Sequence, residues 1–210
     1  LTVFYEDTIN KYERTFILPI KNDFDVQIFP EGGKIIHGAT NCIAFKAIKM
    51  DGLSVDVEGT LYDEEDKKVI DFKSEHLGMG KFCFLTEIFK RYHIIFKTAT
   101  GETKRIDLPK GEKETFALGA VVKYGRILVH VKSELNRMVK DSLTLIGHMG
   151  GTVFYNEPIS GFTPAVVFNT KDMHPGIAHF VLLDKDGIPF SERLAFVRPK
   201  HPTAIAVDFS

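Results

Sequence analysis

The chain has 210 residues, of which 44% are hydrophobic and 26% charged, and its formal net charge is −1. This composition is that of a globular protein and argues against a disordered chain, while the near-neutral charge argues against nucleic acid or an acidic lipid surface as a partner. No run approaches the roughly 18 apolar residues of a membrane-spanning helix, and no signal peptide is evident. The length is sufficient for two small domains.

The two ends of the chain resemble pieces of further modules. Residues 1–21 open without a methionine and in the middle of a strand-like pattern. We interpret them as the end of a preceding module and a linker. Residues 200–210 are interpreted as the linker to a following module.

An alternating strand over residues 24–28 is interrupted by Pro30, Gly32 and Gly33. Proline cannot donate to a sheet ladder, and paired glycines permit the positive φ angles of a turn. A phosphate-binding loop would require G-x-x-x-x-G-K-[ST] leading into a helix, whereas Lys34 is followed by two isoleucines and another strand. The sequence therefore predicts a corner that bends the backbone, with nothing docked against it.

The chain has two cysteines, Cys42 and Cys83, which excludes a small disulfide framework and a four-thiolate zinc site. The apolar neighbours of opposite strand parity are Ile43, Phe45, Phe82 and Phe84. If these neighbours face the core, both thiols face outward. A cross-strand disulfide and two free thiols both fit the sequence, and we favour free thiols because sequence cannot show whether the two strands are neighbours.

Short alternations of apolar and polar residues recur about every ten residues along the rest of the chain, separated by Asp-Gly, Gly-Gly and Pro-Gly pairs. Helical patterns are confined to residues 85–92 and 132–141, and these segments fit strand ends or turns equally well. The sequence predicts an all-β chain with two tandem immunoglobulin-like antiparallel β-sandwiches, at residues 22–109 and 110–199.

Residues 74–76, Ser-Glu-His, contain the side chains of a catalytic triad. Successive strand residues point to opposite faces, and the chain has no G-x-S-x-G nucleophile motif. Its eight histidines show neither H-E-x-x-H nor H-x-H spacing. We expect His93, His130 and His179 on the solvent side of the sheets. The sequence therefore predicts no catalytic, cofactor-binding or metal-binding residue.

Two acidic segments, residues 63–68 and 184–187, could supply oxygen ligands to calcium, but neither has the EF-hand spacing. We interpret both as hairpin turns. Arg193 is expected to pair with a carboxylate across the sheet or at a domain junction. The absence of Trp makes a sugar-binding platform less favoured without excluding one.

Three segments carry a resemblance to a known family: DVQIFPEGGKIIHGATNCIAFKAI at residues 25–48, VDVEGTLYDEEDKKVIDFKSEHLGMGKFCF at 55–84, and GIAHFVLLDKDGIPFSERLAFV at 176–197. The chain resembles the tandem macroglobulin-like modules of large envelope proteins from Bacteroidetes-type bacteria, which are similar to the modules of α2-macroglobulins. The resemblance covers most of residues 22–199. It implies an exported protein, in the periplasm or at the outer membrane, whose modules are sometimes joined to a TonB-plug or carboxypeptidase-regulatory-like domain.

The resemblance implies no catalytic residues and no cofactor, and neither the Cys-Gly-Glu-Gln thioester motif nor a bait region is present in the chain. We therefore expect non-catalytic structural or interaction modules of a larger exported protein. Their expected partners are neighbouring domains of the same chain, with a protein or glycan ligand as a further candidate. The alternatives are a glycan- or peptide-binding module in nutrient capture and a part of a protease-trapping macroglobulin.

Overall fold

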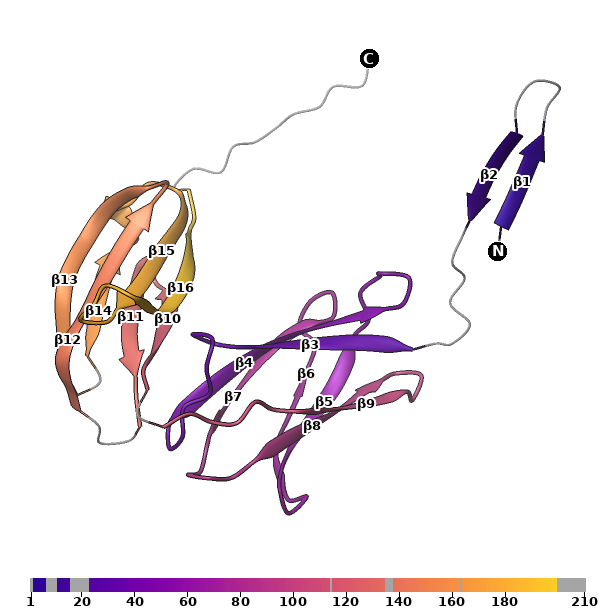
Figure 1. Cartoon of the computed structure of the whole chain (residues 1–210), viewed down its shortest axis with the longest axis horizontal. Helices are drawn as coiled ribbons and strands as arrows, with labels where there is room; N and C mark the ends of the chain where they lie inside the picture. Colours follow the sequence, from indigo (N-terminus) through magenta and orange to yellow (C-terminus); the bar gives the residue numbers. More distant parts are fainter. Residues whose placement is uncertain are drawn as a thin grey trace.

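The computed structural model describes residues 2–6, 11–15, 23–113, 115–134, 138–162 and 164–199. These residues form two β-sandwiches of two antiparallel sheets each and a separate hairpin of β1 (Thr2–Glu6) and β2 (Lys11–Thr15), as Figure 1 shows. The predicted all-β fold with two tandem sandwiches is confirmed.

The first sandwich packs a three-stranded sheet on a four-stranded one. The first sheet has the order β3-β4-β7, with β3 (Phe24–Pro30), β4 (Thr40–Lys49) and β7 (Met79–Leu85). The second has the order β6-β5-β8-β9, with β5 (Val57–Asp63), β6 (Lys68–Lys73), β8 (Tyr92–Thr98) and β9 (Thr103–Asp107). Seven antiparallel strands divided three against four are the architecture of an immunoglobulin-like domain.

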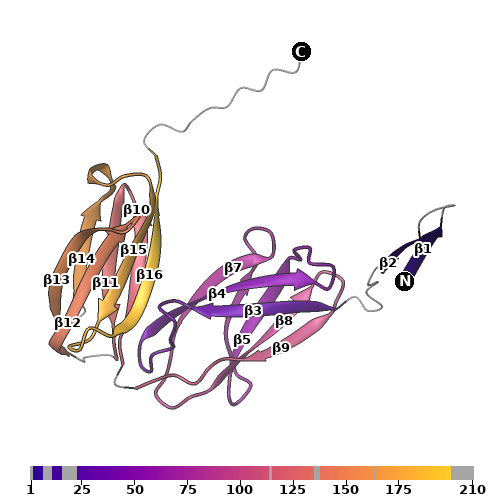
Figure 2. The ribbon, with the colours of Figure 1, turned by 45° about the horizontal axis from the view of Figure 1, so that its top comes forward.

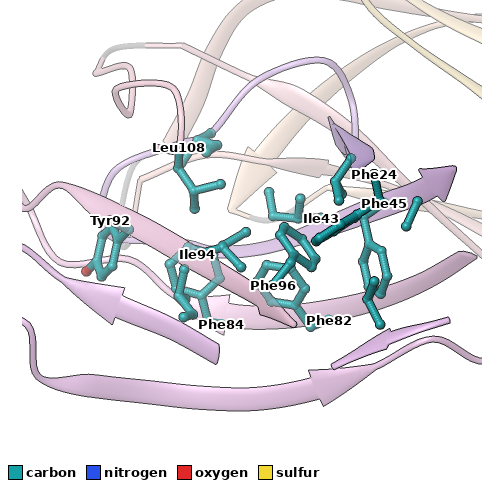
Figure 3. Packing of buried hydrophobic residues seen from close by; sticks show 14 residues of the cluster. Phe24, Ile43, Phe45, Phe82, Phe84, Tyr92, Ile94, Phe96 and Leu108 are labelled. Atoms are coloured by element: carbon teal, nitrogen blue, oxygen red, sulfur yellow. The ribbon is translucent and has the colours of Figure 1, made fainter. Parts of the chain in front are cut away.

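Aromatic rings dominate the core of the first sandwich (Figure 3). Six of its 14 buried residues are aromatic, against one of 12 in the second core. The Phe45 ring lies 5.3 Å from that of Phe72 and 5.4 Å from that of Phe96. Gly80, the cross-strand partner of Phe45, leaves room for this ring, because a Cβ there would lie 2.4 Å from it. Glycine thus stands opposite a large ring that covers it.

The second sandwich repeats the division of three strands against four. Its sheets have the orders β10-β11-β14 and β13-β12-β15-β16. The strands are β10 (Ala117–Lys123), β11 (Arg126–Lys132), β12 (Met138–Met149), β13 (Thr152–Phe162), β14 (Ala165–Asn169), β15 (Gly176–Leu183) and β16 (Pro189–Val197). Its core is mainly aliphatic and includes the fully buried ring of Phe180.

Helix is scarce, as the sequence predicts. The described residues contain one helix, a single 3₁₀ turn at Thr170–Asp172. Residues 85–92 run from the end of β7 into β8, and residues 132–141 join β11 to β12, so neither candidate helix is present in the part that the structure describes.

Cys42 and Cys83 form a disulfide, so the prediction of free thiols is wrong. The two residues are direct partners in the antiparallel pair β4–β7, with Cα atoms 4.0 Å apart. Their predicted outward orientation is confirmed, because the neighbours of opposite parity are buried: Ile43, Phe45, Phe82 and Phe84. The bridge was missed because strand adjacency is a tertiary property.

Candidate functional site: the junction between the sandwiches

The predicted corner after β3 exists. Gly32 and Gly33 both have φ near +83°, and Gly33 N–H donates to the Pro30 carbonyl at 2.9 Å. Positive φ is the conformation that glycine adopts without steric cost. The turn lies at the end of the first sandwich that faces the second, as Figures 1 and 2 show.

The turn docks against the second sandwich, which corrects the expectation that nothing contacts it. The Ser191 hydroxyl on β16 donates to the Gly32 carbonyl at 2.9 Å and accepts from Leu118 N–H at 3.0 Å. A Cβ on Gly32 would lie 2.7 Å from the Leu118 carbonyl oxygen and 2.9 Å from the Ala117 Cβ, whereas Gly33 has open space around it. Gly32 therefore serves close approach between two domains as well as the turn.

Glu31, next to Gly32, lies in an ion-paired cluster with two cations of the second sandwich. Its carboxylate lies 2.7 Å from the Arg193 guanidinium and 3.9 Å from the Lys132 ammonium, and Lys132 also donates to the Glu31 carbonyl at 2.9 Å. The side chains of Glu31 and Lys132 are 13% and 10% exposed. Burial lowers the pKa of Lys132, an effect that the nearby Glu31 charge opposes.

The segment that joins the two sandwiches is attached to the same turn. Glu112 N–H donates to the Ile35 carbonyl at 2.7 Å, and His37 N–H donates to the Glu112 carbonyl at 3.1 Å. Lys34 lies 3.2 Å from the Glu112 carboxylate, and its ammonium lies 4.7 Å from the ring centroid of Phe190. Backbone and side-chain bonds together fix the connection at several points.

Buried Asn41 holds the turn from within the first sandwich. Its amide oxygen accepts from Ile36 N–H at 2.9 Å, and its amide nitrogen donates to the Ile36 carbonyl at 2.8 Å. Thr86 adds a bond from its hydroxyl to the same carbonyl at 2.7 Å. Asn41 and Thr86 therefore fix the segment that follows the turn, because they satisfy both backbone polar groups of buried Ile36.

A cleft of about 530 Å³ opens beside the docked turn. One wall consists of Pro30, Gly32, Gly33 and Lys34, and the other of residues 189–193. Lys34 and Arg193 are the cations here, and both are paired with carboxylates, Glu112 and Glu31. This arrangement is suited to holding two domains together rather than to binding a free anion.

Of the two predicted alternatives for Arg193, a carboxylate across the sheet or one at a domain junction, the structure shows the second, in its pairing with Glu31. The partner Glu31 was not identified from sequence. The sequence does place Glu31 at the tip of a turn, between a strand-ending proline and two glycines. It does not show which residue this glutamate contacts, because Arg193 is 162 residues away in the chain.

The structure does not assemble a catalytic triad from residues 74–76. The Ser74 hydroxyl accepts from Val57 N–H at 3.0 Å, and His76 forms an isolated bridge with Met79 at the sheet end. Within the described residues no group of three His, Cys, Asp or Glu side chains is arranged to hold a metal ion. No helix in the described part has the length and apolarity to cross a membrane.

Both acidic segments are hairpin turns, as predicted. The Asp63 carboxylate accepts from Glu65 N–H and Lys67 N–H, each at 3.0 Å. The Asp184 carboxylate accepts from Asp186 N–H at 2.9 Å and from Ile188 N–H at 2.8 Å. Each carboxylate is occupied by the backbone of its own turn, which is a structural task.

The expected solvent-side position of His93 is wrong. His93 is 4% exposed, its ring is stacked 5.5 Å from that of Tyr62, and it lies 3.3 Å from the Asp66 carboxylate. His130 is half-buried and covers Gly119 across the strand pair, and burial lowers its pKa. His179 is partly exposed and lies 2.9 Å from Glu192, in keeping with the prediction.

An apolar groove of about 960 Å³ lies at the end of the second sandwich opposite the junction. Phe154, Val167 and Phe168 form its floor, and residues 172–177 and the turn around Gly150 form its rim. The groove was not predicted, because its residues come from two sheets and one connecting loop.

No family model matches the chain, and a search of the curated proteins finds no match. Among solved structures, α2-macroglobulin from Salmonella is similar over 94% of this chain at 9% identity and a TM-score of 0.33, and this chain spans 18% of that protein. The bacterial integrin-binding protein invasin is similar over 86% at 15% identity and a TM-score of 0.33, with 40% of it spanned.

A segment of two fibronectin type III domains from chicken tenascin is similar over 85% of this chain and 98% of its own length, at 11% identity and a TM-score of 0.30. The chain is a tandem of immunoglobulin-like β-sandwiches. The strand order of the chain itself shows this fold. Likenesses at these identities and TM-scores carry no argument.

Proposed function

We propose that the tandem is a non-catalytic structural unit of a larger exported protein, which holds neighbouring domains at a fixed spacing. The observation that carries this proposal is the junction, where the turn after β3 contacts the second sandwich through Glu31 and Gly32. A linker without such contacts would leave the two domains free to reorient. Here a reorientation of the domains would break the ion pair between Glu31 and Arg193 and the hydrogen bonds of Ser191.

The disulfide supports the proposed location. Disulfides persist in oxidising compartments and are rare in the cytosol. Cys42 and Cys83 are bridged on the outward face of β4 and β7, where Cys83 is exposed to solvent. We therefore place the protein outside the cytoplasm, with the periplasm or outer membrane as the specific compartment. Reducing and non-reducing electrophoresis of protein isolated from its native host tests this placement.

Two alanine substitutions test the rigid junction. Gly32→Ala and Gly33→Ala both place a Cβ at φ near +83°, which costs roughly 1–2 kcal/mol. Only the Gly32 Cβ collides with the second sandwich. We expect Gly32→Ala to broaden the interdomain distance distribution and Gly33→Ala to leave it unchanged.

The distance is measured by single-molecule FRET between labels on non-natural amino acids at Lys67 and Asp186, two exposed hairpin positions. Small-angle scattering of both variants provides an independent readout. A wild-type distribution as broad as that of Gly32→Ala would show that the junction does not hold the domains, and would refute the proposal.

A peptide-binding role is the second candidate, and the apolar groove of the second sandwich favours it. Its aromatic and aliphatic lining suits an extended apolar segment better than a glycan, which polar and Trp-rich surfaces bind. Titration with a panel of extended apolar peptides, followed by tyrosine fluorescence and melting temperature, tests it. Flat responses across the panel would exclude this candidate.

A further inference from the structure

The two outer ends of the tandem are defined by strand direction. In the first sandwich the loops at residues 50–56, 74–78 and 99–102 lie at the end where β3 begins, away from the junction; we name this the opening end. In the second, the loops at residues 124–125, 150–151 and 170–175, with residues 198–199 after β16, lie away from the junction; we name this the distal end.

The opening end carries mainly negative charge. Its three loops contain four carboxylates, Asp51, Asp56, Glu75 and Glu102, and no lysine or arginine. Lys49 and Lys73 flank these loops, and the ammonium of Lys46, from within β4, donates to Ser54 and Leu77 in them. The carboxylates therefore outnumber the cations at this end of the first sandwich.

The distal end carries the opposite charge. Its loops, flanking strand residues and the two residues after β16 contain four cations, Lys123, Arg126, Lys171 and Arg198. Asp172 is the one carboxylate among them. The two ends of the tandem are therefore electrostatically complementary, which favours end-to-end contact over contact between like ends.

Both ends also expose apolar side chains. At the opening end Met50, Leu53 and Leu77 are more than half exposed. At the distal end Tyr124 is 88% exposed, Val153 and Ile177 are more than half exposed, and Ile177 lines the apolar groove. Apolar side chains gathered at one end, beside polar loops, mark a contact surface.

The loops of each end are fixed to one another. At the opening end Gly78 N–H donates to the Asp56 carboxylate at 2.9 Å, and Lys46 donates to the Leu77 carbonyl at 2.6 Å. At the distal end both the N–H and the hydroxyl of Thr170 donate to the Gly125 carbonyl, at 2.9 and 2.8 Å. Ordered loops lose little entropy when they dock.

Two segments of the sequence, one before the opening end and one leading to the distal end, share a short pattern. Residues 13–19, Glu-Arg-Thr-Phe-Ile-Leu-Pro, resemble residues 192–199, Glu-Arg-Leu-Ala-Phe-Val-Arg-Pro. Each segment includes part of the second strand of an antiparallel hairpin, β1–β2 and β15–β16. A phenylalanine stands ten residues after each proline, and the first of these, Phe29, lies in β3, the strand that begins the first sandwich. A segment that resembles the end of β16 thus precedes β3 in the sequence.

From these observations we infer that the distal end is a docking surface for the opening end of a second copy of this chain. This inference rests on the proposed spacer function and names a partner for the two outer ends of the tandem. The contact joins two different surfaces. In a pair of copies, the opening end of one copy and the distal end of the other therefore stay unoccupied. Such a heterologous contact extends into linear chains instead of closing as a symmetric dimer.

Sedimentation velocity of the purified 210-residue chain tests the inference. We expect the sedimentation coefficient to rise with concentration from the micromolar to the millimolar range at low salt, and to rise less in high salt, where charges are screened. Zero-length carbodiimide cross-linking followed by mass spectrometry should join Lys123 or Lys171 of one copy to Glu75 or Asp51 of another. Isotopic labelling of one copy identifies the intermolecular products.

Charge reversal provides matched variants. K123E/R126E at the distal end should weaken association about tenfold or more, whereas K67E/K185E, with the same change in net charge at hairpins away from both ends, should not. D51K/E75K should also weaken self-association, and a mixture of K123E/R126E with D51K/E75K should associate again. Melting temperatures of all variants confirm that they are folded.

A chain that stays monomeric at low salt and millimolar concentration, without intermolecular cross-links, would overturn the inference. So would equal association of K123E/R126E and K67E/K185E. Neither result affects the FRET distribution across the junction, so failure of this inference is distinguishable from failure of the spacer function.

Discussion

The first sandwich combines an aromatic core with a disulfide, whereas the second has a mainly aliphatic core and no cysteine. Both divide seven strands three against four. Aromatic side chains bury more area each and interlock through ring contacts, while aliphatic residues fill a core in smaller units. One strand layout therefore accepts two different means of stabilisation, and the layout alone does not determine which is used.

The largest expected effect is in the aromatic core. Phe45→Ala removes a ring that is 2% exposed and contacts two other rings, so we expect it to lower the free energy of unfolding of the first sandwich by about 4 kcal/mol. Leu145→Ala in the second core should cost about 3 kcal/mol. Hydrogen exchange by NMR, followed separately in each sandwich, measures both. A larger loss at Leu145 would contradict the dominant role of the rings.

Removal of the disulfide should have the next largest effect. The bridge closes a loop of 41 residues, and replacing both cysteines by serine should destabilise the first sandwich by about 3 kcal/mol. Serine fits the outward positions without burying a polar group. Denaturant unfolding of the double variant measures the change. Protection of backbone amides against hydrogen exchange in the second sandwich serves as the internal control and should stay the same.

The junction links the two regions and should show a smaller effect. Glu31→Gln leaves Lys132 and Arg193 close together without their carboxylate, so we expect a loss of about 2 kcal/mol and weaker coupling between the two unfolding transitions. Glu192→Gln is the control, because Glu192 is exposed beside the same arginine and its pairing with His179 contributes little. Calorimetry of both variants compares them, and equal losses would argue against a buried cluster.

The smallest expected effect is a pH dependence confined to the second sandwich. Burial lowers the pKa of His130 in the folded state below its ordinary value, so the unfolded state binds the proton more readily. Its contribution to stability is present above the unfolded pKa and is lost as the pH falls below it. The neighbouring charges are Lys132, which lowers the pKa further, and Glu31, which opposes it.

We therefore expect the melting temperature to fall between pH 7.5 and pH 5 by more in the wild type than in His130→Gln. Thermal unfolding monitored by tyrosine fluorescence across this pH range measures the difference. Parallel curves for the two proteins would show that His130 titrates alike in the folded and unfolded states.

Local patterns predicted much of the fold. Period-two alternation placed Ile43 and Phe45 in a core and the adjacent cysteine outside it, because side-chain direction in a strand is set by the backbone. Turn chemistry identified the bends at Asp63 and Asp184, where a carboxylate bonds to its own turn. The pairing of Arg193 with a carboxylate at the domain junction was one of the two predicted alternatives.

Long-range pairings were beyond these patterns. His93 was expected in solvent, yet Tyr62 and the Asp66 turn enclose it. The docking of Gly32 on Leu118, the ion pair of Glu31 and the apolar groove each join residues from separate elements. Strand parity assigns a face to each residue but does not say what packs against that face.

Alternation, proline and glycine predict the all-β character of the chain, its two sandwiches and the corner at Pro30, because these patterns act over a few residues. Folding of the chain is what brings Cys42 to Cys83 and the corner to the second domain. These contacts join positions 41 and 159 residues apart, and such distances are closed by folding of a whole domain and by packing of the two domains, not by any local preference.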